Sequence, residues 1–172
     1  MADPIEERVR ATGLLAAGTP VTVLLSGGRD SVCLLDLALR LAGRDAVSAL
    51  HVDYGLRDSA AADEAHCAEL CARLEVPLEV RHPQSRDAGN LQAWARDQRY
   101  AAAAQVVLRR GGVAATGHTA SDQVETVLYR LAASPGRRAL LGMPARSGRL
   151  VRPLLVLSRQ ETAAYCRARG LP

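Results

Sequence analysis

Residues 21–43 read VTVLLSGGRDSVCLLDLALRLAG, and this stretch decides the fold. Five apolar or β-branched residues, 21–25, run directly into the polar turn 26–31, which reads Ser-Gly-Gly-Arg-Asp-Ser. The pattern predicts a buried strand over 21–25 and a helix over 30–41, with a glycine turn between them. A strand, a glycine turn and a helix in this order are typical of an anion-binding site.

The turn has the chemistry of a phosphate site. Gly27 and Gly28 let backbone N–H groups approach a ligand with no Cβ in the way, and the helix start adds a partial positive charge. Ser26 and Ser31 add hydroxyl groups. Asp30 would repel a phosphate unless a cation lay between them, so we interpret it as a Mg²⁺ ligand beside nucleotide phosphates. The alternative is that Asp30 only caps the helix.

The composition excludes several other mechanisms. All 22 basic residues are arginine, and the formal net charge is +4. Because there is no lysine, the chain cannot form a Walker A loop, whose lysine reaches the nucleotide phosphates. A Schiff-base mechanism is excluded for the same reason. The dinucleotide fingerprint G-x-G-x-x-G is also absent.

Strands and helices alternate along the chain. We expect strands over 21–25, 46–52, 76–81, 113–116 and 150–152, and helices over 5–17, 30–41, 58–74, 91–110, 120–132 and 159–170. This alternation predicts an α/β fold, a doubly wound, Rossmann-like parallel sheet of about five strands with helices on both faces. Ligands bind such sheets at the carboxyl ends of the strands, so the polar segments 26–31, 51–57 and 116–126 should meet.

The segment 116–126 reads TGHTASDQVET. Asp122 and Glu125 are three residues apart and share one face of a helix start, where they can hold a metal or a substrate ammonium group. His118, as an imidazolium, can stabilise developing negative charge. The alternatives are that His118 binds a loop carbonyl and that Asp122 is a first-turn carboxylate favoured by the helix dipole.

The segment after the second strand reads HVDYGLR. Its candidate functional residues are His51, Asp53 and Arg57. Their closeness in the sequence is the only reason to group them. A polar strand exit without a further role explains them equally well.

Arginine dominates the region between Glu125 and Glu161, which contains no acidic residue. Arginines without acidic partners favour contact with an anionic macromolecule, most naturally nucleic-acid phosphate. A solvated face in an arginine-rich sequence is the alternative. The candidate RNA-binding residues are Arg137, Arg138, Arg146, Arg149 and Arg152, with Arg130 and Arg159 in the same interval and Arg96 and Arg99 as an extension.

The four cysteines form no C-x-x-C pair, so we interpret them as buried small apolar residues rather than zinc ligands. The N-terminus is charged and lacks a signal-peptide core, and no apolar run reaches membrane-spanning length. With 172 residues, 48% of them hydrophobic, we expect one folded domain, located in the cytoplasm and without a membrane partner.

The turn at 26–31 resembles the S-G-G-x-D-S loop of the N-type ATP pyrophosphatases, the PP-loop superfamily, which split ATP between the α- and β-phosphates. The segments HVDYGLR, NLQAWARDQRY, ATGHTASDQVETVLYRL, LLGM and VRPLL together look like the tRNA(Ile)-lysidine synthetases, from about Val21 to Pro172. The resemblance implies a ligase that adenylates C2 of the wobble cytidine of an isoleucine tRNA with a CAU anticodon. Free L-lysine then displaces AMP. Over the two steps, ATP is converted to AMP and pyrophosphate.

The resemblance also implies residue roles. Asp30 and Asp122 would hold Mg²⁺, the loop 26–31, including Arg29, would hold the pyrophosphate, and the backbone near His51 would read adenine. Asp122 and Glu125 match family positions linked to the lysine substrate, so Asp122 has two candidate roles. His118 and Arg99 would stabilise charge on phosphate or in the transition state.

The sequence departs from the family at two positions and in length. Tyr54 stands where the family often has His, and Ser121 stands where it often has Asp. The family continues into domains that hold the tRNA, so we expect residues 1–172 to be the N-terminal catalytic domain without those domains. One alternative is another PP-loop tRNA-modifying enzyme of the thiolase type, which the lack of C-x-x-C pairs disfavours. Another is a non-catalytic nucleotide-binding module, which would not need Asp30, Asp122 and Glu125.

Overall fold

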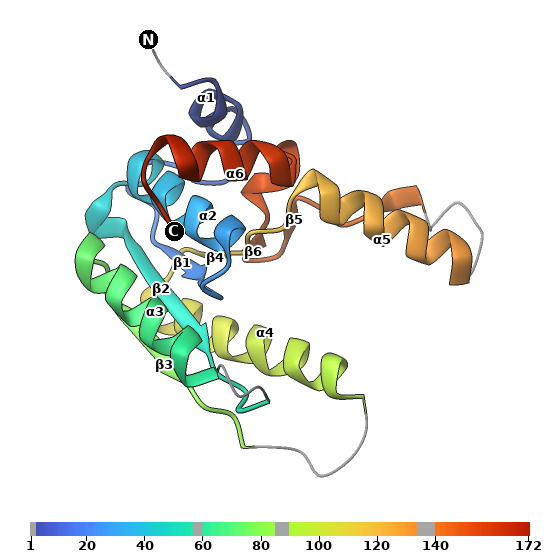
Figure 1. The fold of residues 1–172 in the computed structure, drawn as a ribbon, viewed down its shortest axis with the longest axis horizontal. Helices are drawn as coiled ribbons and strands as arrows, with labels where there is room; N and C mark the ends of the chain where they lie inside the picture. The colour runs from blue at the N-terminus through green and yellow to red at the C-terminus, as the bar shows by residue number, and fades with distance from the viewer. Residues whose placement is uncertain (1–2, 57–59, 85–89, 134–139) are drawn as a thin grey trace.

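The computed structural model describes residues 3–56, 60–84, 90–133 and 140–172. Helices and strands alternate through most of the chain (Figure 1). The elements are α1 (Pro4–Ala11), β1 (Val21–Leu24), α2 (Arg29–Leu41), η1 (Arg44–Ala46), β2 (Val47–Val52), α3 (Ala60–Leu74), β3 (Leu78–Arg81), α4 (Leu91–Arg110), β4 (Val113–Ala115), α5 (Ala120–Ala133), β5 (Arg146–Ser147), β6 (Leu150–Val151), η3 (Pro153–Val156) and α6 (Arg159–Ala168).

The sheet has the order β3-β2-β1-β4-β6-β5. All neighbouring strands are parallel except β5, which is antiparallel to β6. The predicted parallel α/β sheet is therefore confirmed, with six strands in place of about five. The extra strand is β5, whose two residues are too few to give a periodic signal, and which reaches β6 through a turn with Gly148 at φ +59°.

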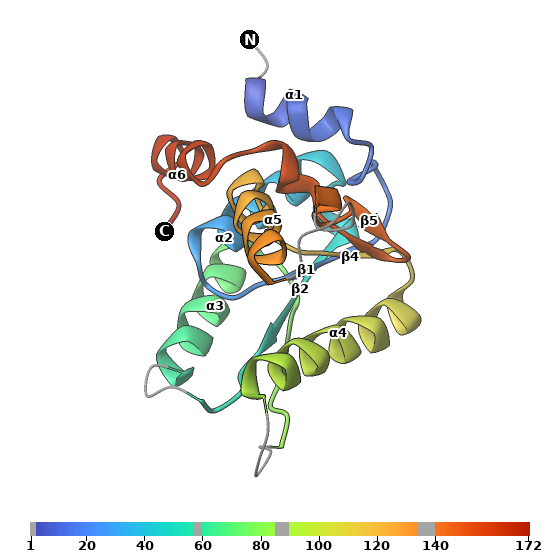
Figure 2. The same cartoon turned by 90° about the vertical axis from the view of Figure 1, so that its right-hand side faces the viewer.

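Helices cover both faces of the sheet, as expected (Figure 2). On one face the β1 residues Val21 and Val23 pack in the main core, together with buried residues of α2, α3 and α6. On the other face Leu24 packs with α4, through small residues such as Ala102 and Ala103. The aliphatic composition of the chain thus gives two apolar layers on the two sides of a buried strand.

The contact between α2 and α6 contains a buried carboxylate, Asp36. It accepts a hydrogen bond from the Tyr165 hydroxyl at 2.6 Å and one from Arg40 Nε at 2.8 Å. The guanidinium of Arg169 lies over the Tyr165 ring, 4.5 Å from its centroid. These partners compensate the carboxylate for its loss of water and join the second helix of the chain to the last.

The first helix is shorter than predicted. It ends at Ala11, not at residue 17, because the Thr12 hydroxyl binds the Val9 carbonyl at 2.7 Å and Gly13 follows with φ +66°. A positive φ ends a helix at little cost only when the residue is glycine.

Helix α5 projects away from the sheet (Figure 1). None of its residues is buried, and Val124, Leu128 and Tyr129 are exposed. The Gln123 side chain connects the helix to the segment that follows it. Its Nε2 donates to the Met143 carbonyl at 2.9 Å, and its Oε1 accepts the Met143 N–H at 2.5 Å. Gly142 makes room for this contact, because a Cβ there would lie 2.6 Å from the Gln123 side chain.

The four cysteines are buried and free, which confirms their interpretation as small apolar residues. Burial raises the pKa of the Cys67 thiol to about 12 and that of Cys71 to about 11. Both thiols are therefore protonated at neutral pH. In the described parts of the chain, no helix has the length and apolar character that crossing a bilayer requires.

Candidate functional site

The three polar strand exits meet in one pocket of about 660 Å³ at the carboxyl ends of β1, β2 and β4. The predicted grouping is confirmed. The predicted site residues that line the pocket are Ser26, Gly28, Arg29, Asp30, Ser31, His51, Asp53, Arg99, His118 and Asp122. Gly27 and Glu125 are not among the lining residues; Gly27 lies between Ser26 and Gly28, which are, and Glu125 lies three residues after Asp122 on α5.

The loop after β1 leads into α2, and two of its amides already bind side chains of the loop: the Ser26 N–H donates to the Ser31 hydroxyl and the Gly28 N–H to the Ser26 hydroxyl. Gly28 is the N-cap residue and supplies no capping side chain. The Ser31 hydroxyl donates to the Gly28 carbonyl at 2.7 Å and holds the loop closed. The alternative that Asp30 caps the helix is wrong, because its Oδ1 instead accepts a hydrogen bond from the Thr162 hydroxyl of α6. The Ser31 N–H is bonded to the Gly28 carbonyl at 2.9 Å, so the N–H groups of Arg29 and Asp30 are the first-turn donors left for an anion.

Two glycines allow the loops around the pocket to approach each other. Gly27 has φ +80°, and a Cβ there would lie 3.3 Å from His66 and 3.4 Å from Cys67. A Cβ on Gly117 would lie 3.0 Å from the Asp30 carbonyl carbon. The turn after β4 therefore touches the backbone of the anion-binding loop, as a shared ligand site requires.

Asp122 and Glu125 lie at the start of α5 and share one cation, Arg159. Arg159 Nη1 donates to Glu125 Oε1 at 2.6 Å, and Nη2 donates to Asp122 Oδ1. The expectation that Arg159 lacks an acidic partner is therefore wrong. The carboxylate pair is able to hold a cation, since it already holds one from α6.

Asp122 also begins its own helix. Its Oδ2 accepts hydrogen bonds from the Thr119 N–H at 2.7 Å and from the Thr119 hydroxyl at 2.8 Å. Burial alone would raise the pKa of Asp122, but these hydrogen bonds and Arg159 outweigh it and lower the pKa below its usual value. Asp122 thus lies in the first turn of α5, as its alternative interpretation required, and the carboxylate is ionised at neutral pH.

His118 lies in the turn between β4 and α5, with Nδ1 at 2.8 Å from the Thr116 hydroxyl. Burial lowers the pKa of His118, and the nearby guanidinium of Arg152 lowers it further. The imidazole is therefore neutral at neutral pH in the ligand-free protein, which differs from the expected imidazolium. A bound phosphate would favour the charged form again.

Arg99 of α4 lines the pocket. Its Nε is buried and has no hydrogen-bond partner among the described residues. Its guanidinium carbon lies 5.8 Å from the centroid of the Tyr100 ring. A buried cationic donor without an acceptor is suited to an anionic ligand.

The β2 exit contributes a buried imidazole and an aromatic contact. His51 Nδ1 lies 2.8 Å from the Leu25 carbonyl, so Nδ1 carries the proton and Nε2 is the acceptor. Tyr54 packs edge-on against Trp94 at 5.9 Å between ring centroids. Asp53 accepts a hydrogen bond from Gly55, and Arg57 lies outside the described residues.

The proposed RNA-binding arginines do not form one set. Arg146 and Arg149 are exposed on the β5–β6 hairpin. The prediction for Arg152 is wrong, because this side chain is only 5% exposed and donates to the Pro144 carbonyl. Arg130 donates to the Gly142 carbonyl at 2.8 Å. Arg137 and Arg138 lie outside the described residues.

Two residues of α6, Arg159 and Thr162, were not predicted as site residues. Thr162 is fully buried and reaches Asp30 across 132 residues of sequence. Arg159 reaches Glu125 across 34 residues. No local motif marks such contacts, since they depend on α6 packing beside α2 and on its position at the start of α5.

Asp30 fits the role of a Mg²⁺ ligand. It is half-buried, lines the pocket and makes no ion pair with any cationic side chain in the described chain. Mg²⁺ prefers hard oxygen ligands and is commonly held by one or two carboxylates together with phosphate oxygens. Asp122 has the same donor chemistry, but Thr119 and Arg159 already occupy its oxygens.

The sequence is similar to curated tRNA(Ile)-lysidine synthases. It is 43% identical to that of Pseudomonas fluorescens over 156 residues, which cover 87% of this chain and 35% of the relative. It is 43% identical to that of Symbiobacterium thermophilum over 181 residues, which cover 98% of this chain and 38% of the relative. The chain therefore spans little more than a third of the length of these relatives.

Solved structures share the fold. The U34-tRNA thiolase NcsA of Methanococcus maripaludis, solved with its 4Fe-4S cluster, aligns with a TM-score of 0.79 and 17% identity over 97% of this chain and 63% of that one. The NH3-dependent NAD synthetase of Campylobacter jejuni aligns with a TM-score of 0.65 and 20% identity over 97% of this chain and 69% of that one. The sequence pattern of the PP-loop domain matches residues 5–172. With the fold, the uncapped loop at the end of β1 and this match in agreement, the chain belongs to the PP-loop domain family.

Proposed function

We propose that this chain is the catalytic domain of a tRNA(Ile)-lysidine synthase. The observation that carries the proposal is the pocket lined by the loop after β1 and by Asp122, a carboxylate that shares the cation Arg159 with Glu125 just outside the lining. A reaction between ATP, a cationic amine and an RNA base needs both features. The similarity to curated synthases supports the same function.

In the first step the C2 oxygen of the wobble cytidine attacks the α-phosphate of ATP, and pyrophosphate leaves. The free amide groups of 26–31 and the hydroxyl of Ser26 bind the departing charge, and Arg99 supplies a cation from α4. His118 is held near the phosphates and gains a proton as the negative charge approaches. Mg²⁺, when bound at Asp30, supplies further charge neutralisation.

In the second step the ε-amine of lysine attacks C2, and AMP leaves. We assign Asp122 and Glu125 to the recognition of lysine in its ammonium form, where it replaces the guanidinium of Arg159. Because the pKa of Asp122 is lowered, this carboxylate is a weak base. Its role is therefore to position the lysine. The ε-ammonium group first gives a proton to water, because only the free amine is nucleophilic. The amine then forms the C2–N bond as the C2–O bond to AMP breaks, and its excess proton passes to water.

The decisive experiment is an incorporation assay with the protein that carries this chain and its natural flanking sequence. It is incubated with unmodified isoleucine tRNA bearing a CAU anticodon, ATP, Mg²⁺ and tritiated lysine. We expect lysine to enter the tRNA with one AMP and one pyrophosphate released for each lysine. Absence of incorporation, with ATP turnover intact, would refute the lysine assignment.

Two variants separate the steps. Asp30→Asn should abolish Mg²⁺-dependent release of pyrophosphate while circular dichroism stays unchanged.

Glu125→Gln should leave pyrophosphate release intact and raise the KM for lysine about tenfold or more, the effect of losing one hydrogen bond to a charged group. Equal loss of both steps in Glu125→Gln would contradict its role in binding the amine.

A further inference from the structure

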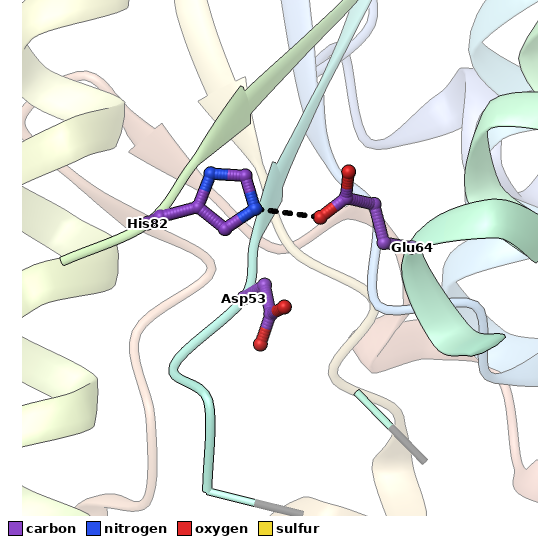
Figure 3. A group of neighbouring side chains, drawn as sticks. All are labelled: Asp53, Glu64 and His82. Atoms are coloured by element: carbon purple, nitrogen blue, oxygen red, sulfur yellow. Dashed lines mark hydrogen bonds and ion pairs between the residues drawn. The ribbon is translucent and has the colours of Figure 1, made fainter. Parts of the chain in front are cut away.

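Three potential metal ligands converge beside the nucleotide pocket. They are Asp53, Glu64 and His82. Figure 3 shows His82 and Glu64 facing each other, with Asp53 beside them and its carboxylate turned away from the pair in this view. One ligand atom of each residue lies within 4.8 Å of the other two. No other group of three or more such ligands occurs among the residues that the structure describes.

The strand register places two of these residues next to each other. Val52 of β2 pairs with Arg81 of β3, so Asp53 and His82 follow at equivalent positions. The Asp53 N–H continues the ladder by donating to the Arg81 carbonyl at 2.9 Å. Because residues in register on parallel strands point to the same face, Asp53 and His82 share one side of the sheet end.

Helix α3 supplies the third residue. Its buried residues Cys67, Leu70 and Cys71 pack in the core on the sheet. Glu64 lies three residues before Cys67, which is close to one helical turn, and therefore points toward the sheet on the same side of the helix. The packing that buries Cys67 thus brings the Glu64 carboxylate to the strand ends.

The existing contacts leave room for an ion. His82 Nε2 lies 2.7 Å from Glu64 Oε2, and no arginine of the described chain pairs with Glu64 or Asp53. Asp53 Oδ1 accepts the Gly55 N–H at 2.7 Å, and Oδ2 has no hydrogen-bond partner among the residues that the structure describes. Two carboxylates facing one imidazole leave an excess of negative charge that a divalent cation would neutralise.

We propose that Asp53, Glu64 and His82 bind a divalent first-row transition cation of the Zn²⁺ or Co²⁺ type through one nitrogen and two oxygens. An imidazole ligand favours these metals over Mg²⁺, which prefers oxygen alone. Ligands about 2.0–2.2 Å from zinc lie about 3.4 Å apart in a tetrahedron, which falls between the 2.7 Å of the His82–Glu64 contact and the 4.8 Å limit of the group. The ion would tie α3 to the ends of β2 and β3, where Asp53 also lines the nucleotide pocket.

The test is a Co²⁺ titration of the tag-free, metal-stripped protein without nucleotide, followed by visible absorption and by competition with Zn²⁺. We expect one equivalent to bind, with a spectrum typical of nitrogen and oxygen ligands. His82→Ala and Glu64→Gln should each weaken binding at least about tenfold, since even the loss of an outer-shell partner costs that much. Glu69→Gln, an exposed change on the same helix, should bind like wild type.

Thermal unfolding gives a second readout. Zn²⁺ should raise the Tm of the wild-type protein and leave that of His82→Ala unchanged, because only the native site binds the ion. Three results would overturn the proposal: no binding at millimolar Co²⁺, unchanged affinity in both ligand variants, or a thiolate charge-transfer band that assigns the metal to cysteine. The first would mean that His82 and Glu64 form a surface ion pair and nothing more.

Discussion

At Gly112 the backbone has no space for a methyl group. A Cβ there would lie 1.8 Å from the Pro20 carbonyl oxygen, which accepts the Val113 N–H at 2.9 Å. This hydrogen bond begins the pairing of β1 with β4, the two strands that carry the anion-binding loop and the His118 turn. The neighbouring Gly111 also has a positive φ, of 78°, but a Cβ there would meet open space.

The two glycines form a matched pair for mutation. Gly111→Ala should cost about 1–3 kcal/mol, the strain of a conformation that L-residues avoid. Gly112→Ala carries comparable strain and the clash with Pro20 as well, so it should cost more than about 4 kcal/mol or prevent folding. Urea unfolding of both variants measures the difference. Equal losses would show that the loop moves aside and that the close approach is not required.

The role of a single residue could be predicted when its contacts are with residues close to it in the sequence. The place of Asp30 in the pocket could be predicted from six consecutive residues, because the strand, turn and helix around it are local. The partner of Glu125 could not be predicted, since Arg159 lies 34 residues away and belongs to another helix. The expectation that Arg152 lies on the surface was wrong, because the residues next to it in the sequence do not indicate that its guanidinium is buried and donates to the Pro144 carbonyl.

At the scale of elements, α6 shows how a local signal fixes a helix start. Ser158 and Glu161 form a capping box in which each side chain binds the other's backbone N–H. Glu161 also pairs with Arg8 of α1. The start of α6, which carries Arg159 and Thr162, is therefore held both by its own sequence and by the first helix.

This capping box predicts a pH dependence of stability. The Ser158 N–H, Arg8 and the Ser158 hydroxyl lower the pKa of Glu161 to about 2. In the unfolded chain the pKa of a glutamate is about 4.3, so the folded state favours the ionised form of Glu161. The stabilisation is complete above that value and is lost as the pH falls toward the folded pKa.

Glu161→Gln should therefore be less stable than wild type at neutral pH, and the gap should close as the pH is lowered. Urea unfolding across the acidic range measures this. Glu69→Gln, an exposed change on α3, serves as the control and should show no such convergence. A gap that stayed constant with pH would mean that the charge of Glu161 contributes nothing to the start of α6.

Element prediction succeeded where a pattern was long. The helices at Arg29–Leu41 and Leu91–Arg110 have enough turns for their spacing to be read, and Asn90 caps the second as expected, through the Ala93 N–H. The two-residue strand Arg146–Ser147 escaped prediction because pairing with Leu150–Val151, not sequence, makes it a strand. The early end of α1 depends on Thr12 and Gly13, which compete with an apolar run.

At the scale of the whole molecule, the exposed arginines Arg146 and Arg149 extend from the edge of the sheet on one hairpin. If they contact RNA phosphates, replacing both with alanine should weaken tRNA binding and reduce the salt dependence. The slope of log affinity against log salt should fall by about 2, one unit for each lost phosphate contact.

Filter-binding titrations at several salt concentrations measure this slope. Arg10→Ala with Arg167→Ala removes the same charge from α1 and α6, where both side chains are exposed. That control should shift the slope much less. Equal effects of the two double variants would mean that only net charge matters and that the hairpin is not an RNA contact.

The general rule for parallel sheets predicted which segments meet, and the fold obeys it at β1, β2 and β4. The rule says nothing about helices that do not cover the sheet. The projection of α5 therefore could not be foreseen, since its sequence has the spacing of an ordinary amphipathic helix while none of its side chains is buried.

The link between α2 and α6 has a consequence for the order of synthesis. Asp30 and Asp36 meet Thr162 and Tyr165, which follow 132 and 129 residues later. During translation Asp30 and Asp36 therefore emerge well before their partners in α6. The nascent domain exposes the underside of α2 until α6 has been synthesised, and contacts across such separations close slowly. Nucleotide binding is therefore expected to begin only after α6 has left the ribosome and packed against α2. ATP would then bind the completed domain and not the growing one.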